Sequence, residues 1–464
     1  MRWALREPLL RSIVVLAVSL AIAACGGGEE AAPSGQTPGA TPSAGPVRID
    51  LWHSETAANA DTLERLISRY NSSQAEVKVR PTYQGTTTDL LAKLVSSLGS
   101  GRVPAVALMS EVDTQRLIDS GAFVPVQDFI DRDGYDLSDL DTRAVRYYTV
   151  QDELWAMPYA ANVPLLYYNK TMFSEVGLDP DTPPQDLEEL RSYSEKILQR
   201  DASGQVTRSG IALDIRLWTD MILAEHGDFL VNNDNGRDGR ATEVLLDNDT
   251  TRWFFGWWHD MVSDGLAFNA GRNPTFVDTF LAMASGRAAM AWSYASALRS
   301  VVDALEKGVQ GVEVGIGAMP GVPGSTESPS LLGNALWILS SRPVEEQEAA
   351  WKLIQWLVEP EQQAEWFAGS GYLPVSLSSL DLPAAKEVVA RYPLFQIALD
   401  LYRKGSATPA SLGALIGPFP EVHENMLRGV EEMLNGVKDP QEALEDAAAA
   451  SNRAIEEYNR RLKQ

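Results

Sequence analysis

The sequence predicts an α/β protein, because its first folded stretch alternates short strands with amphipathic helices. Residues 47–52 (VRIDLW) alternate apolar and polar side chains, as expected for a half-buried strand. Residues 103–109 are almost continuously apolar, which is typical of a strand buried in a parallel sheet. Two helices and a short strand at 77–79 lie between them, so the order βαβαβ predicts a parallel sheet with right-handed crossovers.

Both helices present one apolar face. In the first, with Asn59 or Asp61 as the expected cap, the apolar positions are Leu63, Leu66, Ile67 and Tyr70. In the second, which ends at the GSG of 99–101, they are Leu90, Leu91, Leu94, Val95 and Leu98. Beyond residue 159 the pattern changes to longer helices, expected over 184–200, 251–264, 345–358 and 421–435.

The amino terminus has the pattern of a bacterial lipoprotein signal. Three arginines precede an apolar run over 12–24, which is shorter than the roughly 20 residues that span a bilayer. The run ends in the sequence IAAC at 22–25, and Cys25 is the only cysteine of the chain. The alternative is an ordinary signal peptide with a cysteine beside the cut by chance. We favour lipidation, because acylation removes a thiol that could pair with no other cysteine.

Residues 26–46 contain mainly Gly, Ala, Pro, Ser and Thr, with no large apolar side chain. Such a segment cannot bury enough surface to offset its ordering entropy, so we expect a disordered tether over 25–46. The 418 residues that follow contain no apolar run of about 18, and we expect them to form a soluble body of two or three domains.

The net negative charge of the chain limits the kinds of molecule that it can bind. The chain carries −24, and removal of a signal peptide with three arginines and one glutamate (+2) would leave −26. A protein that binds nucleic acid needs a basic face, so the charge argues against that class. Twelve tryptophans and 14 tyrosines offer aromatic faces for sugar rings, although many are expected in the core.

Catalytic and metal-binding motifs are missing from the sequence. Its four histidines show no zinc-ligand spacing, and it contains neither GxSxG nor GxxxxGK. Residues 232–239 (NNDNGRDG) only faintly resemble a calcium loop, because the carboxylate spacing and closing Glu are absent, and we expect a turn there. The sequence therefore predicts no enzyme, no cofactor and no metal site.

Several strings resemble the family 1 extracellular solute-binding proteins of ABC importers, and in particular their glycerol-3-phosphate-binding branch. They occur in the family's order over nearly the whole chain after the tether: RIDLWHS (48–54), NADTLERLISRYN (59–71), VKVRPTYQG (77–85), VPVQDFID (124–131), PLLYYNKTMFSEVGLDPDTPP (164–184), NNDNGRDG (232–239) and EWFAGSGYLPVS (365–376).

The resemblance implies a two-lobed clamshell of the type II periplasmic-binding-protein class, each lobe a mostly parallel sheet flanked by helices. Carried onto this chain, the first lobe would be 47–158 plus 332–375, and the second 159–331 plus 376–464. It also implies a monomer outside the cytoplasmic membrane whose lobes close on a small solute and deliver it to permease subunits.

The resemblance also implies the residues that contact the ligand. Glu111 matches a family acid, Gly333 a glycine whose backbone faces the ligand, and Tyr372 a ligand-contacting tyrosine, while Tyr83 and Gln84 lie beside the pocket. From the residues alone, Glu111 is also explained as an acid at a helix N-terminus, and Tyr372 as a core residue.

Four positions depart from the glycerol-3-phosphate branch. Thr87 replaces a tyrosine, Asn162 a serine, Tyr294 (or its neighbour Ser293) another serine, and His423 a phosphate-binding arginine. A mostly neutral histidine cannot hold phosphate by two parallel bonds as arginine does. Arg216 would restore the charge if it pointed into the cleft.

Two ligand classes remain open. A neutral sugar, oligosaccharide or polyol, which we favour, would use Glu111, Asn162 and His423 for hydrogen bonds and would stack on Trp218, Trp292, Tyr294 and Tyr372. A glycerol-phosphate or glycerophosphodiester would be held by Arg216 or by helix N-termini. Other classes are a surface carbohydrate-active enzyme, which needs two carboxylates across its cleft, and an adhesin without a ligand.

We predict that Cys25→Ser releases the protein from the membrane and leaves ligand binding intact, because the lipid is the only anchor in the sequence. Fractionation of cells that express either form checks this. A serine variant that still sediments wholly with membranes after cleavage at a comparable site would show that the lipobox interpretation is wrong.

Overall fold

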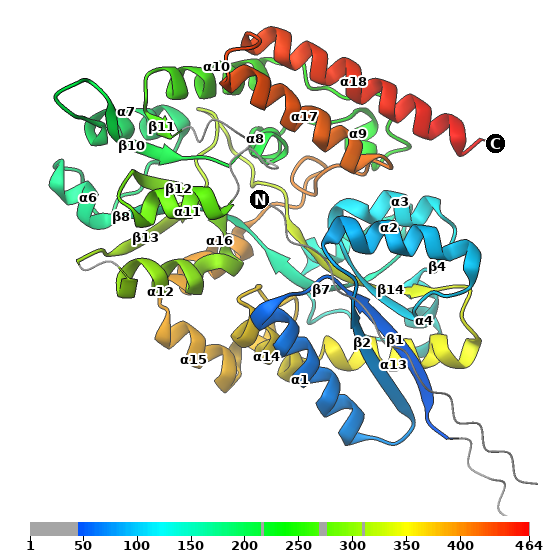
Figure 1. Ribbon diagram of the computed structural model, residues 1–464. Coiled ribbons are helices and arrows are strands. Elements are labelled where there is room, and N and C mark those ends of the chain that lie inside the picture. The colour runs from blue at the N-terminus through cyan, green and yellow to red at the C-terminus, as the bar shows by residue number, and fades with distance from the viewer. Residues whose placement is uncertain (1–44, 215–217, 269–275, 309–310, 464) are drawn as a thin grey trace, which may run out of the picture. The chain divides into compact units, whose positions relative to one another are not determined.

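Two β-sheets, each flanked by helices, organise the computed structural model of the chain (Figure 1). The structure describes residues 45–214, 218–268, 276–308 and 311–463. Pro46–Gln464 form one compact unit, and none of the helices in the described ranges is long and apolar enough to cross a membrane. The predicted α/β class is confirmed.

The first sheet has the order β2-β1-β3-β14-β4, with β7 also paired to β14. Its strands are β1 (Val47–His53), β2 (Val77–Tyr83), β3 (Val106–Ser110), β4 (Phe123–Val124), β7 (Met157–Asn162) and β14 (Leu332–Leu339). β1 runs parallel to both β2 and β3, which confirms the predicted βαβαβ start. β14 is antiparallel to β3, β4 and β7.

The helices around this sheet follow the predicted apolar faces except at Val95, which is 46% exposed. They are α1 (Ala57–Ser73), α2 (Thr87–Ser97), α3 (Thr114–Asp119), α4 (Val126–Asp133), α5 (Thr142–Tyr148), α13 (Val344–Leu357) and α14 (Pro360–Ser370). α1 buries Leu63, Leu66, Ile67 and Tyr70 as predicted. Its cap is Thr56, so the expected cap at Asn59 or Asp61 is wrong; both residues lie inside the helix. A short hairpin, β5 (Thr149–Val150) and β6 (Glu153–Leu154), follows α5.

The second sheet has the order β11-β10-β12-β8-β13, with β9 paired to β10. Its strands are β8 (Pro164–Asn169), β9 (Gln199–Arg200), β10 (Val206–Ala212), β11 (Ala267–Phe268), β12 (Ala288–Tyr294) and β13 (Val314–Ala318). β10 is parallel to β11 and β12, whereas β8 is antiparallel to β12 and β13.

Helices make up much of the rest of the chain. They are α6 (Lys170–Glu175), α7 (Leu187–Ile197), α8 (Trp218–His226), α9 (Asn232–Gly236), α10 (Asp249–Ser263), α11 (Phe276–Ala284), α12 (Leu298–Gly308), α15 (Pro383–Arg391), α16 (Leu394–Lys404), α17 (Phe419–Leu434) and α18 (Pro440–Arg461). The four long helices predicted from periodicity correspond to α7, α10, α13 and α17. Four short 3₁₀ turns complete the described elements: η1 (Leu98–Ser100), η2 (Glu111–Asp113), η3 (Ala295–Ala297) and η4 (Ser378–Asp381).

The chain first passes from one sheet to the other at Val163. β7 pairs with β14 in the first sheet, and β8 pairs with β12 in the second, so only Val163 separates the two strands. The predicted boundary after residue 158 would have assigned β7 to the second lobe. The chain returns to the first sheet between β13 and β14. We call the two sheets, with the helices that pack on them, the first and second lobes.

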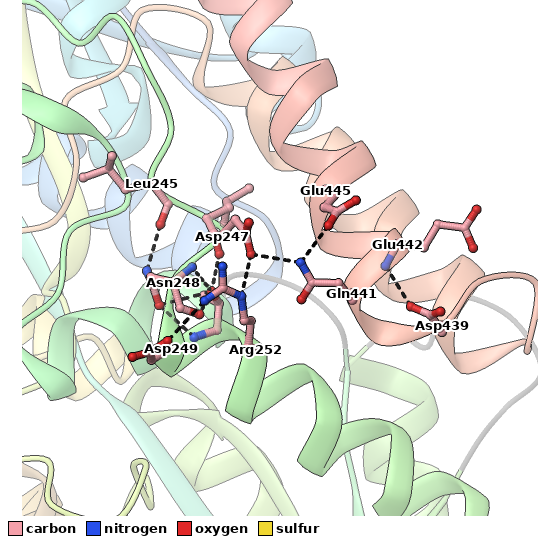
Figure 2. Close-up of polar contacts among 11 residues, drawn as sticks. Leu245, Asp247, Asn248, Asp249, Arg252, Asp439, Gln441, Glu442 and Glu445 are labelled. Atoms are coloured by element: carbon pink, nitrogen blue, oxygen red, sulfur yellow. Dashed lines mark hydrogen bonds and ion pairs between the residues drawn. The ribbon is translucent and has the colours of Figure 1, made fainter.

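Two local features lie in the second lobe. Residues 233–235 turn with left-handed backbone angles, and Asn235 Oδ1 accepts from the backbone N–H of Leu230 (2.8 Å), so 232–239 contains the predicted turn. Figure 2 shows how α18 joins α10: Asp247 accepts from Arg252 (2.8 Å) on α10 and from Gln441 (3.3 Å) on α18. The C-terminal helix is thereby tied to the second lobe.

Candidate functional site

A cavity of about 590 Å³ lies where strands of the first sheet end and α17 of the second lobe approaches. Ser54–Thr56 follow β1, and Ser110–Asp113 include the end of β3 and the turn after it. The carboxyl ends of parallel strands meet at one sheet edge, where α/β proteins commonly bind ligands. The lining residues are Ser54, Glu55, Thr56, Asn59, Thr87, Thr88, Leu91, Ser110, Glu111, Val112, Asp113, Asn162, Tyr294, Ser296, Leu332, Gly333, Asn334, Tyr372, Phe419, Pro420 and His423.

The lining is acidic. Three carboxyl groups belong to it, those of Glu55, Glu111 and Asp113, and each of these residues is less than 10% exposed (7, 7 and 4%). No described lining residue is Lys or Arg. In the described ranges, no cluster of three His, Cys, Asp or Glu side chains is arranged to hold a metal ion. The cavity therefore offers hydrogen-bond acceptors to a ligand rather than fixed positive charge.

Glu55 is held by two amides. Its carboxyl oxygens accept from Asn59 Nδ2 (2.8 Å) and from Asn334 Nδ2 (3.0 Å). Burial raises the pKa of Glu55, and these two hydrogen bonds act in the opposite direction. Asn334 also hydrogen-bonds to the side chain of Tyr372. The network fixes an acid and a tyrosine on the same wall of the cavity.

Glu111 occupies the equivalent place after β3. Ser110 Oγ donates to its carboxyl group (2.8 Å), and the backbone of Gly333 also hydrogen-bonds to it. Burial raises the pKa of Glu111 to about 7 despite these bonds. Burial, and then the nearby charge of Glu111, raises the pKa of Asp113 to about 7 as well. Near neutral pH this pair can therefore both donate and accept hydrogen bonds.

Gly333 is required by strand packing. A Cβ atom there would lie 2.1 Å from the carbonyl oxygen of Ala160 on the neighbouring strand β7. The missing side chain lets β7 and β14 approach and leaves the backbone of Gly333 free to reach Glu111. The close approach that the structure shows is toward Ala160 and Glu111, and contact of the Gly333 backbone with a ligand stays a prediction.

Asn162 joins the two lobes beside the cavity. Its Nδ2 donates to Ser296 Oγ (2.9 Å), and its Oδ1 accepts from the backbone N–H of Ser296 (3.1 Å). Because Ser296 follows β12 of the second sheet, these bonds connect the end of β7 to the other lobe. One N–H of the Asn162 amide remains available to a ligand.

Aromatic rings from both lobes of the protein line the cavity. Tyr372 stacks on Trp366 in the first lobe (ring centroids 6.2 Å apart), and burial raises its pKa well above the ordinary value. Tyr294 stacks on Trp218 in the second (5.6 Å). His423 is half-buried one turn after the start of α17, with its ring 6.0 Å from that of Phe419.

Six of the residues expected from sequence come together in this cavity, besides Gly333: Thr87, Glu111, Asn162, Tyr294, Tyr372 and His423. Tyr83 does not line it; it is 53% exposed and packs against His53. Gln84 and Ser293 do not line it either. Trp218 and Trp292 are fully buried, so neither presents a stacking face, and Trp218 instead supports the ring of Tyr294. Arg216 and Cys25 lie outside the described residues.

Sequence reasoning missed Glu55, Asn59, Asp113, Asn334 and Phe419. Glu55 had a signal, because it follows a parallel strand just as Glu111 does. Asn334 had none, since its position depends on the antiparallel insertion of β14 beside β3, a strand far away in the sequence.

Ion pairs connect the lobes near the cavity. Arg116 of α3 donates to Glu421 of α17 (2.6 Å), and Arg240 donates to Asp119 (2.6 Å), which also accepts from Tyr458 of α18 (3.0 Å). Asp119 is the buried member of this group, with its side chain 3% exposed. The wall formed by α17 is thus held toward the strand ends of the first sheet.

Comparison with known proteins places the chain as a whole among its relatives. Residues 65–396 match the family described as "Bacterial extracellular solute-binding protein". The sn-glycerol-3-phosphate-binding periplasmic protein UgpB of Escherichia coli is 26% identical over 383 residues, which cover 81% of this chain and 84% of that protein. The Yersinia pestis protein of the same name is 26% identical over 385 residues, covering 81% and 85%.

Solved structures share the fold. UgpB from Mycobacterium tuberculosis, in complex with glycerophosphocholine, aligns with a TM-score of 0.73 at 20% identity and covers 90% of this chain and 100% of that one. The cyclic α-maltosyl-1,6-maltose binding protein of Arthrobacter globiformis aligns with a TM-score of 0.70 at 22% identity, covering 89% and 100%. The predicted two-lobed fold is confirmed. The sheets are not mostly parallel as expected, because β14 and β8 enter them antiparallel to their neighbours.

The raised pKa of Glu111 predicts a pH-dependent stability. The carboxyl titrates near 4.5 when unfolded and near 7 when folded, so the folded chain holds more protons between these values. Its contribution to the free energy of unfolding is therefore fully present below pH 4.5 and is lost as pH rises through 7, by on the order of 3 kcal/mol.

Thermal unfolding between pH 5 and pH 8 checks this prediction. Glu111→Gln should show a smaller loss of stability with rising pH than the wild type. The matched control is Glu424→Gln, at an exposed position of α17. Equal slopes for wild type, Glu111→Gln and the control would show that Glu111 does not titrate in this way.

Proposed function

The chain belongs to the bacterial extracellular solute-binding proteins, and from this premise we propose that it captures a neutral sugar, oligosaccharide or polyol in the cavity and delivers it to the permease of an ABC importer. The observation that carries the choice of ligand is the charge of the lining. Three carboxyl groups and no described Lys or Arg face this space. These carboxyl groups exchange hydrogen bonds with the hydroxyl groups of a ligand, and each of them that is ionised repels a phosphate.

The geometry supports a polyhydroxylated ligand. Glu55, Glu111 and Asp113 supply acceptors, whereas Asn162 and Asn334 supply amide groups. Tyr294 and Tyr372 stand on different lobes and carry ring faces that can cover the apolar C–H groups of a sugar. A volume of about 590 Å³ falls in the usual range for small-molecule sites.

A phosphate ester is the second candidate, and one observation favours it. The helices α1, α2 and α17 all begin at the cavity, where Thr56, Thr87 and Phe419 belong to its lining. Helix N-termini attract anions through their N–H groups and the helix dipole. The three carboxyl groups oppose that attraction, so we place this candidate second.

The proposal extends to location and movement. We propose that a lipid on Cys25 holds the protein outside the cytoplasmic membrane, and that the monomer closes its lobes over the solute about the segment at Val163. Asn162 and Ser296 would keep the lobes in register during closure, because their hydrogen bonds lie beside that segment. A carbohydrate-active enzyme would instead release products from candidate glycans.

His423 distinguishes the two ligand classes. If the ligand is neutral, the imidazole makes one hydrogen bond, and His423→Ala should weaken a sugar or polyol roughly 3- to 10-fold. His423→Arg should not restore that affinity. If the ligand is a phosphate ester, His423→Arg should tighten binding, most clearly at low salt, because arginine forms a bidentate pair with phosphate.

Thermal-shift screening against sugars, polyols and phosphate esters identifies one ligand of each class, since a ligand at 100 times its dissociation constant stabilises by about 2.7 kcal/mol. Titration calorimetry then measures both variants, with His259→Ala on α10, outside the cavity lining, as the control. One result would contradict both roles considered for His423. In it, the wild type binds the phosphate ester more tightly than His423→Arg does, and neither protein responds to any sugar.

A further inference from the structure

A second cavity lies at the other end of the first sheet's strands, where β1 and β2 begin. It measures about 330 Å³, and four basic side chains line it, those of Arg48, Lys78, Arg80 and Arg342. Asp50 is the single carboxylate of its lining. This composition is unusual for a chain with 39 basic and 63 acidic residues. We call these five residues the basic groove.

The strand register places like charges side by side. Arg48 of β1 is directly opposite Lys78 of β2, and Asp50 is opposite Arg80. Arg80 binds Asp50 through two bonds of 2.8 Å, so that pair is internally compensated. Like charges directly opposite each other on neighbouring strands are destabilising. Arg48 and Lys78 therefore gain from a negative group that bridges them.

The protein does not supply that negative group within the described residues. Lys78 donates only to the backbone carbonyls of Asn71 and Gln74, and Arg48 makes no ion pair there. Arg342 completes the wall of the groove, and its guanidinium is fixed by Glu346 (2.6 Å). An anion with several oxygens, such as a phosphate, matches this arrangement of an ammonium group beside guanidinium groups.

We propose that the basic groove binds the phosphate group of an anionic phospholipid. The chain enters β1 at Val47, beside Arg48, and the proposed lipid on Cys25 lies only 23 residues before Arg48. If the tether expected from sequence over 25–46 behaves as a random coil, a segment of that length would have a root-mean-square reach of roughly 25 Å and would keep the groove close to the bilayer. The membrane source of the phosphate rests on the proposed anchor; the anion chemistry of the groove does not.

The groove and the ligand cavity can be occupied together. Arg48 and Lys78 lie at the beginnings of β1 and β2, whereas Ser54–Thr56 and Thr87 follow the ends of the same strands. A lipid phosphate in the groove would thus orient the protein with the beginnings of β1 and β2 toward the bilayer. The cavity, which lies beyond the ends of these strands, would stay accessible to a solute.

Binding of the body to vesicles tests the proposal. Because Pro46–Gln464 form a compact unit with their own hydrophobic cores, residues 45–464 can be used without the anchor. Sedimentation is measured with vesicles of phosphatidylglycerol and phosphatidylcholine (about 3:7) and of phosphatidylcholine alone. The body should bind the first and not the second, and added salt should weaken binding because it screens exposed charges.

Arg48→Gln with Lys78→Gln should lower the affinity for the anionic vesicles roughly 20-fold, and the exposed Arg48→Gln alone roughly fivefold. The matched control removes the same charge from the end of α16, through Arg403→Gln with Lys404→Gln, and should change affinity less than about twofold. Inorganic phosphate should compete with the vesicles.

Equal losses in the groove and control variants would overturn the proposal, since they would reflect overall charge. An absence of vesicle binding would also overturn the proposal. If the groove bound inorganic phosphate but no vesicles, a phospholipid would be excluded as the source of the phosphate. Calorimetry of the groove variant with the solute identified by screening keeps the two proposals apart, because that response should be unchanged whatever the vesicles show.

Discussion

The cavity between the lobes depends on one constraint of the first sheet: β1 and β3 are parallel neighbours, and both end beside the cavity. Each strand is followed by a carboxylate, Glu55 after β1 and Glu111 after β3, and each carboxylate is stabilised by hydrogen bonds from its surroundings. β14 enters this edge antiparallel to β3 and brings Asn334 to Glu55. The acidic character of the cavity therefore follows from strand order rather than from any contiguous motif.

The second lobe completes the cavity through a short connection. A single residue, Val163, separates β7 from β8, so the two sheets cannot be far apart at this point. Asn162 fixes the geometry by bonding to Ser296, and the ion pairs of Arg116 and Arg240 hold α17 and its neighbours beside the strand ends. Tyr294 and His423 reach the cavity because of these contacts.

The sequence predicted local structure well because apolar spacing reports burial directly. The faces of α1 and α2 and the parallel start of the first sheet are of this kind. It failed at the cap of α1, where Thr56 has extended backbone angles that the apolar pattern does not encode. The passage after residue 158 was implied by the resemblance alone, whereas the pairing of β7 with β14 belongs to the first sheet.

The residues predicted for the site also include some that line the cavity and some that do not. Glu111, Tyr372 and His423 were located through a resemblance, and they converge in one cavity. Trp218 and Trp292 were assigned to stacking from residue type alone, yet both are fully buried, since a large ring serves a core as readily as a site. Asn334 could not have been found, because its role is created by a long-range strand pairing.

In the proposed function, both lobes contact one solute at this cavity. Amide hydrogen exchange, measured with and without a saturating ligand, tests it segment by segment. We expect protection to concentrate in Ser54–Asn59, Ser110–Asp113, Leu332–Asn334 and Phe419–His423, which come from both lobes. Protection confined to one lobe, or to segments away from this cavity, would contradict it.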